Sequence, residues 1–135
     1  MVIIVKNVDA GYVLNAEANY VLNANKKQKF QAMNKPILHL NLIHNWYDMV
    51  EADIKLEEYR DITSHWSNIF YNGHIKIKGK YYHPTDVVIC FSNGYQTNRR
   101  QQFRECSGLS VKCGNPEWGA KEGVQYYTLS IGKRV

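Results

Sequence analysis

The alternation of apolar and polar residues between positions 36 and 60 predicts a strand, a short helix and a second strand. Residues 37–43 form a β-rich apolar run that Pro36 opens. Apolar side chains then recur at the i, i+3, i+4 and i+7 spacing of one helix face over about residues 44–52, namely Ile43, Trp46, Tyr47 and Val50. The aromatic pair on this face is expected to pack in the core rather than to contact a ligand. Residues 55–60 follow as the second strand.

A second helix is indicated over about residues 64–71, where apolar side chains again fall near helical spacing. Thr63 or Ser64 can cap its N-terminus through a side-chain oxygen. Asn72-Gly73 is expected to end the helix, with the glycine in the left-handed conformation.

Lysines alternate with isoleucines in the segment 74–85, and on one extended strand they would line a single face: Lys76, Lys78 and Lys80. A lysine face beside Tyr81 and Tyr82 suits phosphate contact with base stacking. It equally suits an edge strand that uses lysine to avoid aggregation. The sequence leaves both alternatives open.

The C-terminal half reads as three further strands. Residues 86–91 are an unbroken apolar run, typical of a strand that is buried on both faces. Residues 102–113 are long enough for one bent strand with a bulge at Gly108, and residues 124–131 alternate until Gly132 ends the last strand. Short strands, two early helices and no repeated βαβ unit favour the α+β class with a mixed or antiparallel sheet or barrel.

Composition narrows the function only slightly. A chain of 135 residues fits one domain, and a formal charge of +5 favours a polyanionic partner weakly. Cys90, Cys106 and Cys113 lack C-x-x-C spacing, which favours buried thiols in a reducing cytoplasm. The five histidines are scattered, so we expect no metal site and no cofactor. No apolar run approaches the roughly 20 residues of a membrane span, so we expect no membrane association.

The first 32 residues differ in character from the rest. They carry an eight-residue near-repeat, Tyr12–Asn19 followed by Tyr20–Lys27, and two copies are too few for a solenoid. We predict that residues 1–32 are an N-terminal extension of undetermined role, laid as a strand or hairpin on the edge of a domain formed by residues 33–135. The lysines at 26, 27 and 29 are more typical of a solvated linker than of a binding site.

The second strand concentrates the charge of the chain. On an extended segment Glu58 and Arg60 share one face, Glu57 and Tyr59 share the other, and Lys55 sits at the mouth of the strand. A carboxylate and a guanidinium on an inward face can hold each other ionised and still offer donors and acceptors to a ligand. A solvated edge is the alternative, because charged side chains are rarely buried unless paired.

Two loops add candidate contacts. Arg99 and Arg100 follow an F-S-N-G-Y turn and could hold phosphates, although a solvated loop is slightly favoured. Trp118 lies in a glycine-bounded P-E-W-G loop, where it could form a lid over a pocket. Tyr95 and Trp118 are candidates for stacking on bases.

The spacing of Lys55, Glu58 and Arg60 after a short helix resembles the signature of the ASCH family, which reads about G-x-K-x-x-E-x-R. Asp53 stands where that signature has glycine. The F-S-N-G-Y and P-E-W-G segments are similar to those of phage and bacterial proteins of this type, and the resemblance covers about residues 35–133. It implies a small PUA-like β-barrel, mixed or antiparallel, with two flanking helices.

The same resemblance implies an RNA- or nucleotide-binding module with a charged cleft beside the barrel. Lys55 and Arg60 would engage phosphate or a base edge, and Glu58 would accept a hydrogen bond from an exocyclic amine. The alternative is a hydrolase, either a ribonuclease or an amidohydrolase of acetylcytidine, with Lys55 and Glu58 as acid–base partners. Glu58 occupies the position where the amidohydrolase branch carries threonine, which weakens that activity. A protein-interaction role of phage origin is a third hypothesis.

Overall fold

The structure, a computed structural model, describes residues 34–135; the predicted N-terminal extension, its near-repeat and its lysines lie outside the described residues. The elements are β1 (Ile37–Leu42), α2 (His44–Glu51), β2 (Glu57–Arg60), α3 (Ser64–Ile69), β3 (Phe70–Tyr71), β4 (His74–Ile77), β5 (Lys80–Tyr82), η1 (Pro84–Asp86), β6 (Val88–Asn93), β7 (Gln101–Cys113), η2 (Pro116–Trp118) and β8 (Gln125–Arg134), where η marks a 3-10 turn. Two short helices among mostly strands confirm the predicted α+β class.

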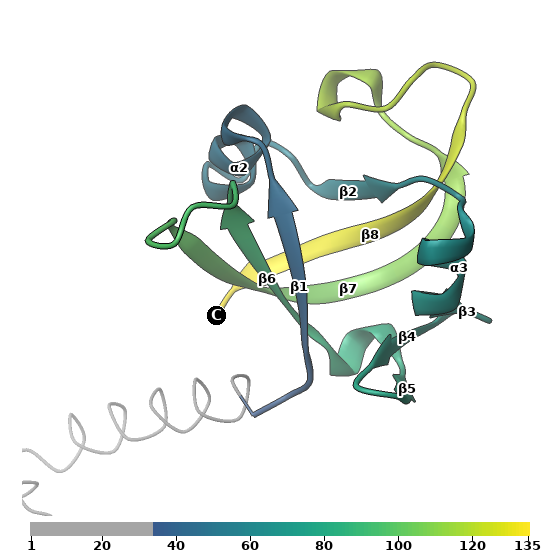
Figure 1. Cartoon of the computed structure of the whole chain (residues 1–135). Helices are drawn as coiled ribbons and strands as arrows, with labels where there is room; N and C mark the ends of the chain where they lie inside the picture. Colours follow the sequence, from purple (N-terminus) through teal and green to yellow (C-terminus); the bar gives the residue numbers. More distant parts are fainter. Residues whose placement is uncertain (1–33) are drawn as a thin grey trace, which may run out of the picture. The chain divides into compact units, whose positions relative to one another are not determined.

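Two sheets organise this part of the chain. The larger has the strand order β1-β6-β7-β8-β2, and β1 and β6 are its one parallel pair. The smaller is the antiparallel meander β3-β4-β5. Figure 1 shows β7 and β8 as the long curved strands of the larger sheet, with α2 near one end and α3 beside the small sheet. Strands β1 and β2 form the two edges of the five-stranded sheet, and within residues 34–135 the pairing leaves that sheet open.

The core lies against β6, which is buried from Val88 to Ser92 as expected for a strand covered on both faces. The predicted helix face is confirmed at Tyr47 and Val50, which are buried in the core cluster. Ile43 departs from that face because it precedes the helix as its N-cap and stays exposed. No helix among residues 34–135 has the length and apolar character needed to cross a membrane.

The bent strand predicted for residues 102–113 is confirmed in β7, whose pairing with β8 shifts register between Arg104 and Gly108. The predicted end of β8 at Gly132 is wrong, since the strand continues and Arg134 pairs with Arg104. A Cβ atom at position 132 would lie 2.8 Å from the hydroxyl oxygen of Ser107. The glycine therefore allows close approach of the two strands instead of ending one of them.

The second helix is shorter than predicted. Thr63 caps it as expected, because its hydroxyl accepts a hydrogen bond of 3.4 Å from the backbone N–H of Trp66. The helix ends at Ile69, and Asn72-Gly73 does not cap it: both residues have positive φ, +53° and +74°, and they form the turn between β3 and β4. A two-residue turn with positive φ at both positions matches the twist of a β-hairpin.

The predicted single lysine face is also wrong. Lys78 and Gly79 have φ of +51° and +80° and form a second two-residue hairpin turn, between β4 and β5. Lys76 is consequently paired with Tyr81, while Lys80 is paired with Ile77 on the opposite face. The turn divides the three lysines between two faces and the hairpin tip.

Candidate functional site

A tight turn after α2 delivers Lys55 to the interior. The backbone N–H groups of Ile54 and Lys55 both donate to the carbonyl oxygen of Met49, at 2.9 and 3.0 Å. Asp53 has φ of +60°, the left-handed conformation that glycine adopts most readily and that aspartate tolerates better than most residues. Its carboxylate is held by the Arg104 guanidinium at 2.6 Å. Aspartate can therefore occupy the position where the ASCH signature has glycine.

Glu58 is shared by two cations, and we call Lys55, Glu58 and Arg60 the charged cluster. Lys55 Nζ lies 2.8 Å from one carboxylate oxygen, and Arg60 Nη2 lies 2.6 Å from the other. The ammonium also donates to the backbone carbonyl of Glu57. Lys55 is only 1% exposed and Glu58 is buried, so the alternative of a solvated charged edge is excluded for these two residues. The predicted shared face of Glu58 and Arg60 is confirmed.

Arg60 connects the cluster to its surroundings. Its side chain is 19% exposed, and Nη2 donates a second hydrogen bond of 3.1 Å to the backbone carbonyl of Asn41 on β1. The guanidinium lies over the Trp66 ring of α3, 5.0 Å from the ring centroid. Its Nε is buried and has no hydrogen-bond partner among the described residues. An unsatisfied charged donor is costly, so this atom favours an additional acceptor.

The opposite face of β2 holds the 114–120 loop. The Glu57 carboxylate accepts hydrogen bonds from Tyr59 at 2.7 Å and from Lys112 at 2.6 Å. The Tyr59 hydroxyl in turn accepts one of 2.9 Å from the backbone N–H of Asn115. Burial alone would raise the pKa of Glu57, but the hydrogen bonds from Lys112 and Tyr59 outweigh it and hold the pKa below its ordinary value. Burial and the neighbouring Glu57 raise the pKa of Tyr59 above its ordinary range.

The two faces of β2 together carry an unbalanced charge. Three cations, Lys55, Arg60 and Lys112, are paired with two carboxylates, Glu57 and Glu58, which leaves one net positive charge. Two of these cations are mostly shielded from water, where charge–charge interactions are stronger than in bulk solvent. The arrangement favours an anionic ligand over a neutral or cationic one.

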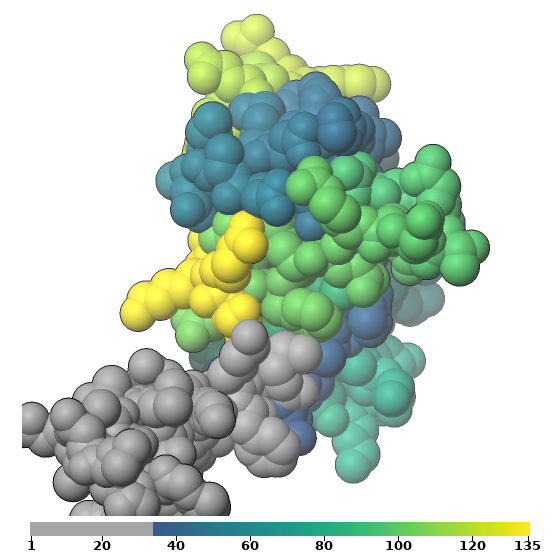
Figure 2. Space-filling model, turned by 90° about the vertical axis from the view of Figure 1, so that its left-hand side faces the viewer, coloured from purple at the N-terminus to yellow at the C-terminus, as the bar shows by residue number. Residues whose placement is uncertain are grey.

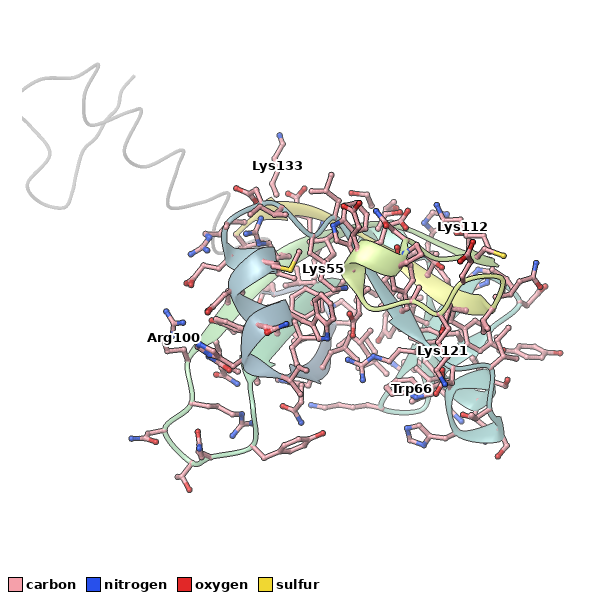
Figure 3. The ribbon with its side chains drawn as sticks, turned by 90° about the horizontal axis from the view of Figure 1, so that it is seen from above. Lys55, Trp66, Arg100, Lys112, Lys121 and Lys133 are labelled. Carbon is pink, nitrogen blue, oxygen red and sulfur yellow. The ribbon has the colours of Figure 1, made fainter. Side chains whose placement is uncertain are left out.

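The two loop arginines lie elsewhere. Arg100 donates to Asp48 and Glu51 of α2, each at 3.2 Å, and Arg99 donates to the Gln96 carbonyl within its own loop. Figure 2 shows α2 on one face of the molecule, with the loop after β6 beside it. In Figure 3, seen from above, Arg100 lies well away from Lys55. The structure therefore does not bring these arginines to the charged cluster, and their contact with phosphate stays a prediction.

The two aromatic candidates are also apart from the cluster. Tyr95 is exposed in the turn after β6, and Trp118 is half-buried in η2. Within the described part of the chain, neither shares a side-chain hydrogen bond or ring contact with Lys55, Glu58 or Arg60. The η2 loop does pack on α2, since a Cβ atom at Gly119 would lie 3.1 Å from the Trp46 ring. Stacking of a base on Tyr95 or Trp118 stays a prediction.

Sequence reasoning missed two residues that build this site. Trp66 was expected only as part of a helix face, yet its ring supports Arg60. Arg104, on the strand predicted for residues 102–113, is buried and donates a hydrogen bond of 2.7 Å to the Val50 carbonyl as well as one to Asp53. The available signal was its spacing on the predicted strand, two residues from Cys106, which places both side chains on one face.

Among residues 34–135, no group of three or more histidine, cysteine, aspartate or glutamate side chains is arranged to hold a metal ion. Comparisons with protein-family models, with curated proteins and with solved structures find no match to this chain. The likeness to the ASCH family therefore rests on the sequence signature, and it enters below as part of a proposal.

Proposed function

We propose that this chain is an RNA- or nucleotide-binding module of the PUA-like, ASCH type, whose ligand docks at Arg60. The observation that carries the proposal is the state of the Arg60 guanidinium. It is oriented by Glu58, supported by the Trp66 ring and left with one unsatisfied buried donor. A planar guanidinium held in this way is suited to a phosphate or to the edge of a base.

The charge of the site supports an anionic ligand. Glu58 neutralises only one of the two cations that contact it, and Lys55 has no access to solvent. A phosphate beside Arg60 would supply the missing negative charge and an acceptor for Nε. Phosphate contacts of this kind supply much of the affinity of proteins for nucleic acids.

The cluster divides into one contact residue and two positioning residues. Arg60 is the partly exposed member and is the residue that meets the ligand. Glu58 fixes the guanidinium, and Lys55 fixes Glu58 from the interior. Lys55 is buried, so its ammonium group can contact a ligand directly only if the residues that precede β2 move.

The proposal includes a PUA-like barrel. Strands β1 and β2 are the two edges of the five-stranded sheet, and Arg60 spans from one edge to a backbone carbonyl of the other. Edges that come within reach of one side chain are expected when a twisted sheet curls toward closure. In this arrangement the ligand site lies at the seam of the barrel.

A hydrolase is the second candidate, and the 2.8 Å contact between Lys55 and Glu58 is the observation that favours it. A lysine and a carboxylate at that distance can exchange a proton during catalysis. Either an RNA phosphodiester or the amide of an acetylated nucleoside would be the bond cleaved.

Binding is tested by fluorescence anisotropy with labelled single-stranded RNA at about 50 and about 200 mM salt. We expect salt-sensitive binding of the wild type and at least about tenfold weaker binding of Arg60→Lys, which keeps the charge but loses the planar fork. Arg134→Lys is the matched control, because Arg134 is a half-exposed residue at the end of β8. Equal effects of the two substitutions, or no binding by the wild type, would refute the proposal.

The hydrolase candidate is tested on the same samples. RNA and acetylated nucleosides are incubated with the wild type and with Lys55→Ala, and the products are read by mass spectrometry. A product that forms with the wild type and disappears in the variant identifies an enzyme, and the RNA affinity of the variant shows how much of the loss follows from weaker binding. If no product forms, the hydrolase candidate is rejected and the binding module remains as the proposed function.

A further inference from the structure

The outer face of the small sheet is an exposed surface of aromatic and basic side chains. Strand pairing places four residues on it, and the ring of His83 joins them by contact with His74. We call these five residues the aromatic platform: Tyr71, His74, Lys76, Tyr81 and His83. The other face of the same sheet carries Phe70 and Ile75, which are buried in the core. The platform therefore faces away from the protein interior.

The two tyrosine rings of the platform lie side by side. Tyr71 is 63% exposed and Tyr81 is 47% exposed, and their ring centroids lie 6.0 Å apart at an interplanar angle of 54°. The Lys76 ammonium lies 5.8 Å from the centre of the Tyr81 ring. Burial does not account for these rings, since a packing role would shield them from water.

The segment that builds the platform carries charge of one sign. Between Tyr71 and Thr85 the chain has three lysines and two histidines and no aspartate or glutamate. Lys78 stands at the tip of the adjoining hairpin turn. None of these lysines is in a salt bridge with another described residue, so the cations are available to an anionic partner.

A hollow lies beside the platform, between β3 and the strands β7 and β8. It has a volume of about 390 Å³, and Tyr71, Phe70 and Tyr127 are among its walls. Tyr127 lies directly opposite Arg60 in the pairing of β2 with β8. Phe70 stacks on Trp66, the ring that supports Arg60, with centroids 5.6 Å apart. The platform and the hollow therefore share Tyr71, and Phe70 and Tyr127 connect the walls of the hollow to the residues that surround Arg60.

We propose that the aromatic platform binds single-stranded nucleic acid, with a base stacked on Tyr81 and the backbone phosphates held by Lys76 and Lys78. This inference rests on the proposed function and narrows its ligand to an unpaired strand. Stacking requires a base whose face is accessible, which a single strand offers and a duplex does not. Alternating tyrosine rings and unpaired lysines match the alternation of bases and phosphates in such a strand.

The test uses the full chain and a labelled 12-nucleotide single-stranded RNA, compared with the same sequence as a duplex. The variants are Tyr81→Leu, which removes the aromatic face, and Tyr81→Phe, which keeps it. We expect tighter binding of the single strand than of the duplex, about tenfold weaker binding by Tyr81→Leu and nearly unchanged binding by Tyr81→Phe. Lys76→Gln should weaken binding and reduce its salt dependence, whereas Lys133→Gln, at an exposed position near the end of β8, should do neither.

The outcomes separate this inference from the proposed function. If the wild type binds RNA and Tyr81→Leu binds equally well, the platform is overturned while the site at Arg60 stands. If the wild type binds neither RNA form, both are overturned. Preference for the duplex would contradict the proposal that the platform binds a single strand. Binding to vesicles of anionic lipid without RNA binding would contradict the proposal that it binds nucleic acid. Unchanged melting temperatures of the two Tyr81 variants show that any loss of binding is not a loss of fold.

Discussion

The Arg60 guanidinium, on one edge strand of the five-stranded sheet, donates a hydrogen bond of 3.1 Å to the backbone carbonyl of Asn41 on the other edge strand. No backbone pairing joins these two strands within residues 34–135, so the side chain spans the opening. The same guanidinium binds Glu58 and lies over Trp66. A residue proposed to contact the ligand is therefore also a residue that holds the sheet edges together.

Replacement of Arg60 by alanine should destabilise the domain as well as abolish binding. Arg60→Ala leaves Glu58 paired with Lys55, but it removes the 2.6 Å hydrogen bond to the other carboxylate oxygen and the donor to the Asn41 carbonyl. Loss of a hydrogen bond to a charged group costs about 1.5–3 kcal/mol. Arg60 is partly exposed, so we expect the lower end of that range, read as a lower midpoint in urea denaturation. Arg134→Ala is the control and should change stability by less than about 1 kcal/mol, because its ion pair is half-exposed and long at 3.9 Å. An unchanged midpoint for Arg60→Ala would contradict the burial of the pair.

Glu57 should make folding stability sensitive to acid. Its pKa is held below the ordinary value of 4.5, so the folded state favours the ionised carboxylate. The stabilisation is complete above the ordinary pKa and is lost as the pH falls through the lower pKa of the folded state. Glu57→Gln should therefore be less stable than the wild type at neutral pH, and the difference should shrink in acid.

The measurement for Glu57 is the thermal midpoint of the two proteins from about pH 7 to about pH 3. Convergence of the two curves at low pH is the expected result. Curves that stay parallel across the whole range would show that Lys112 and Tyr59 do not hold this carboxylate ionised.

Gly114→Ala should loosen the loop that Tyr59 anchors. The added Cβ atom would lie 2.6 Å from the Cβ of Ala120 and 2.8 Å from the Tyr59 ring, so the loop or the ring must shift. Forced overpacking of this kind costs about 1–3 kcal/mol. Gly108→Ala is the matched control, since the added Cβ atom would lie 3.9 Å from the nearest side-chain atom, the Ser130 hydroxyl oxygen. Equal midpoints for the two variants would exclude the close approach at position 114.

One of the three thiols should react much faster than the others. Cys113 is exposed, whereas Cys90 and Cys106 are buried, and burial raises the pKa of both buried thiols. A thiol-specific chromogenic reagent should label one equivalent rapidly in the folded protein and all three after denaturation. Cys113→Ser should remove the rapid phase, and a rapid phase that survives this substitution would place the reactive thiol elsewhere.

Local pattern determined much of this protein. The strand and helix before residue 60 follow from apolar spacing, because the periods of a strand and a helix are set by backbone geometry. The pairing of Glu58 with Arg60 follows in the same way, since side chains two apart on a strand share a face. The Thr63 cap and the bulge in β7 could also be predicted from the sequence, because each depends on a few neighbouring residues.

Only the tertiary structure decided how distant segments meet. The sequence could not show that Arg60 reaches Asn41, that Lys55 is covered, or that Arg100 is held by α2, because each depends on strand order and on packing across the chain. The prediction of a single lysine face was wrong because a two-residue turn at Lys78-Gly79 reverses the chain, and this turn brings Tyr81 of β5 beside Lys76 of β4 on the aromatic platform. Local geometry thus fixed the faces of single strands, while non-local pairing fixed which faces became a site.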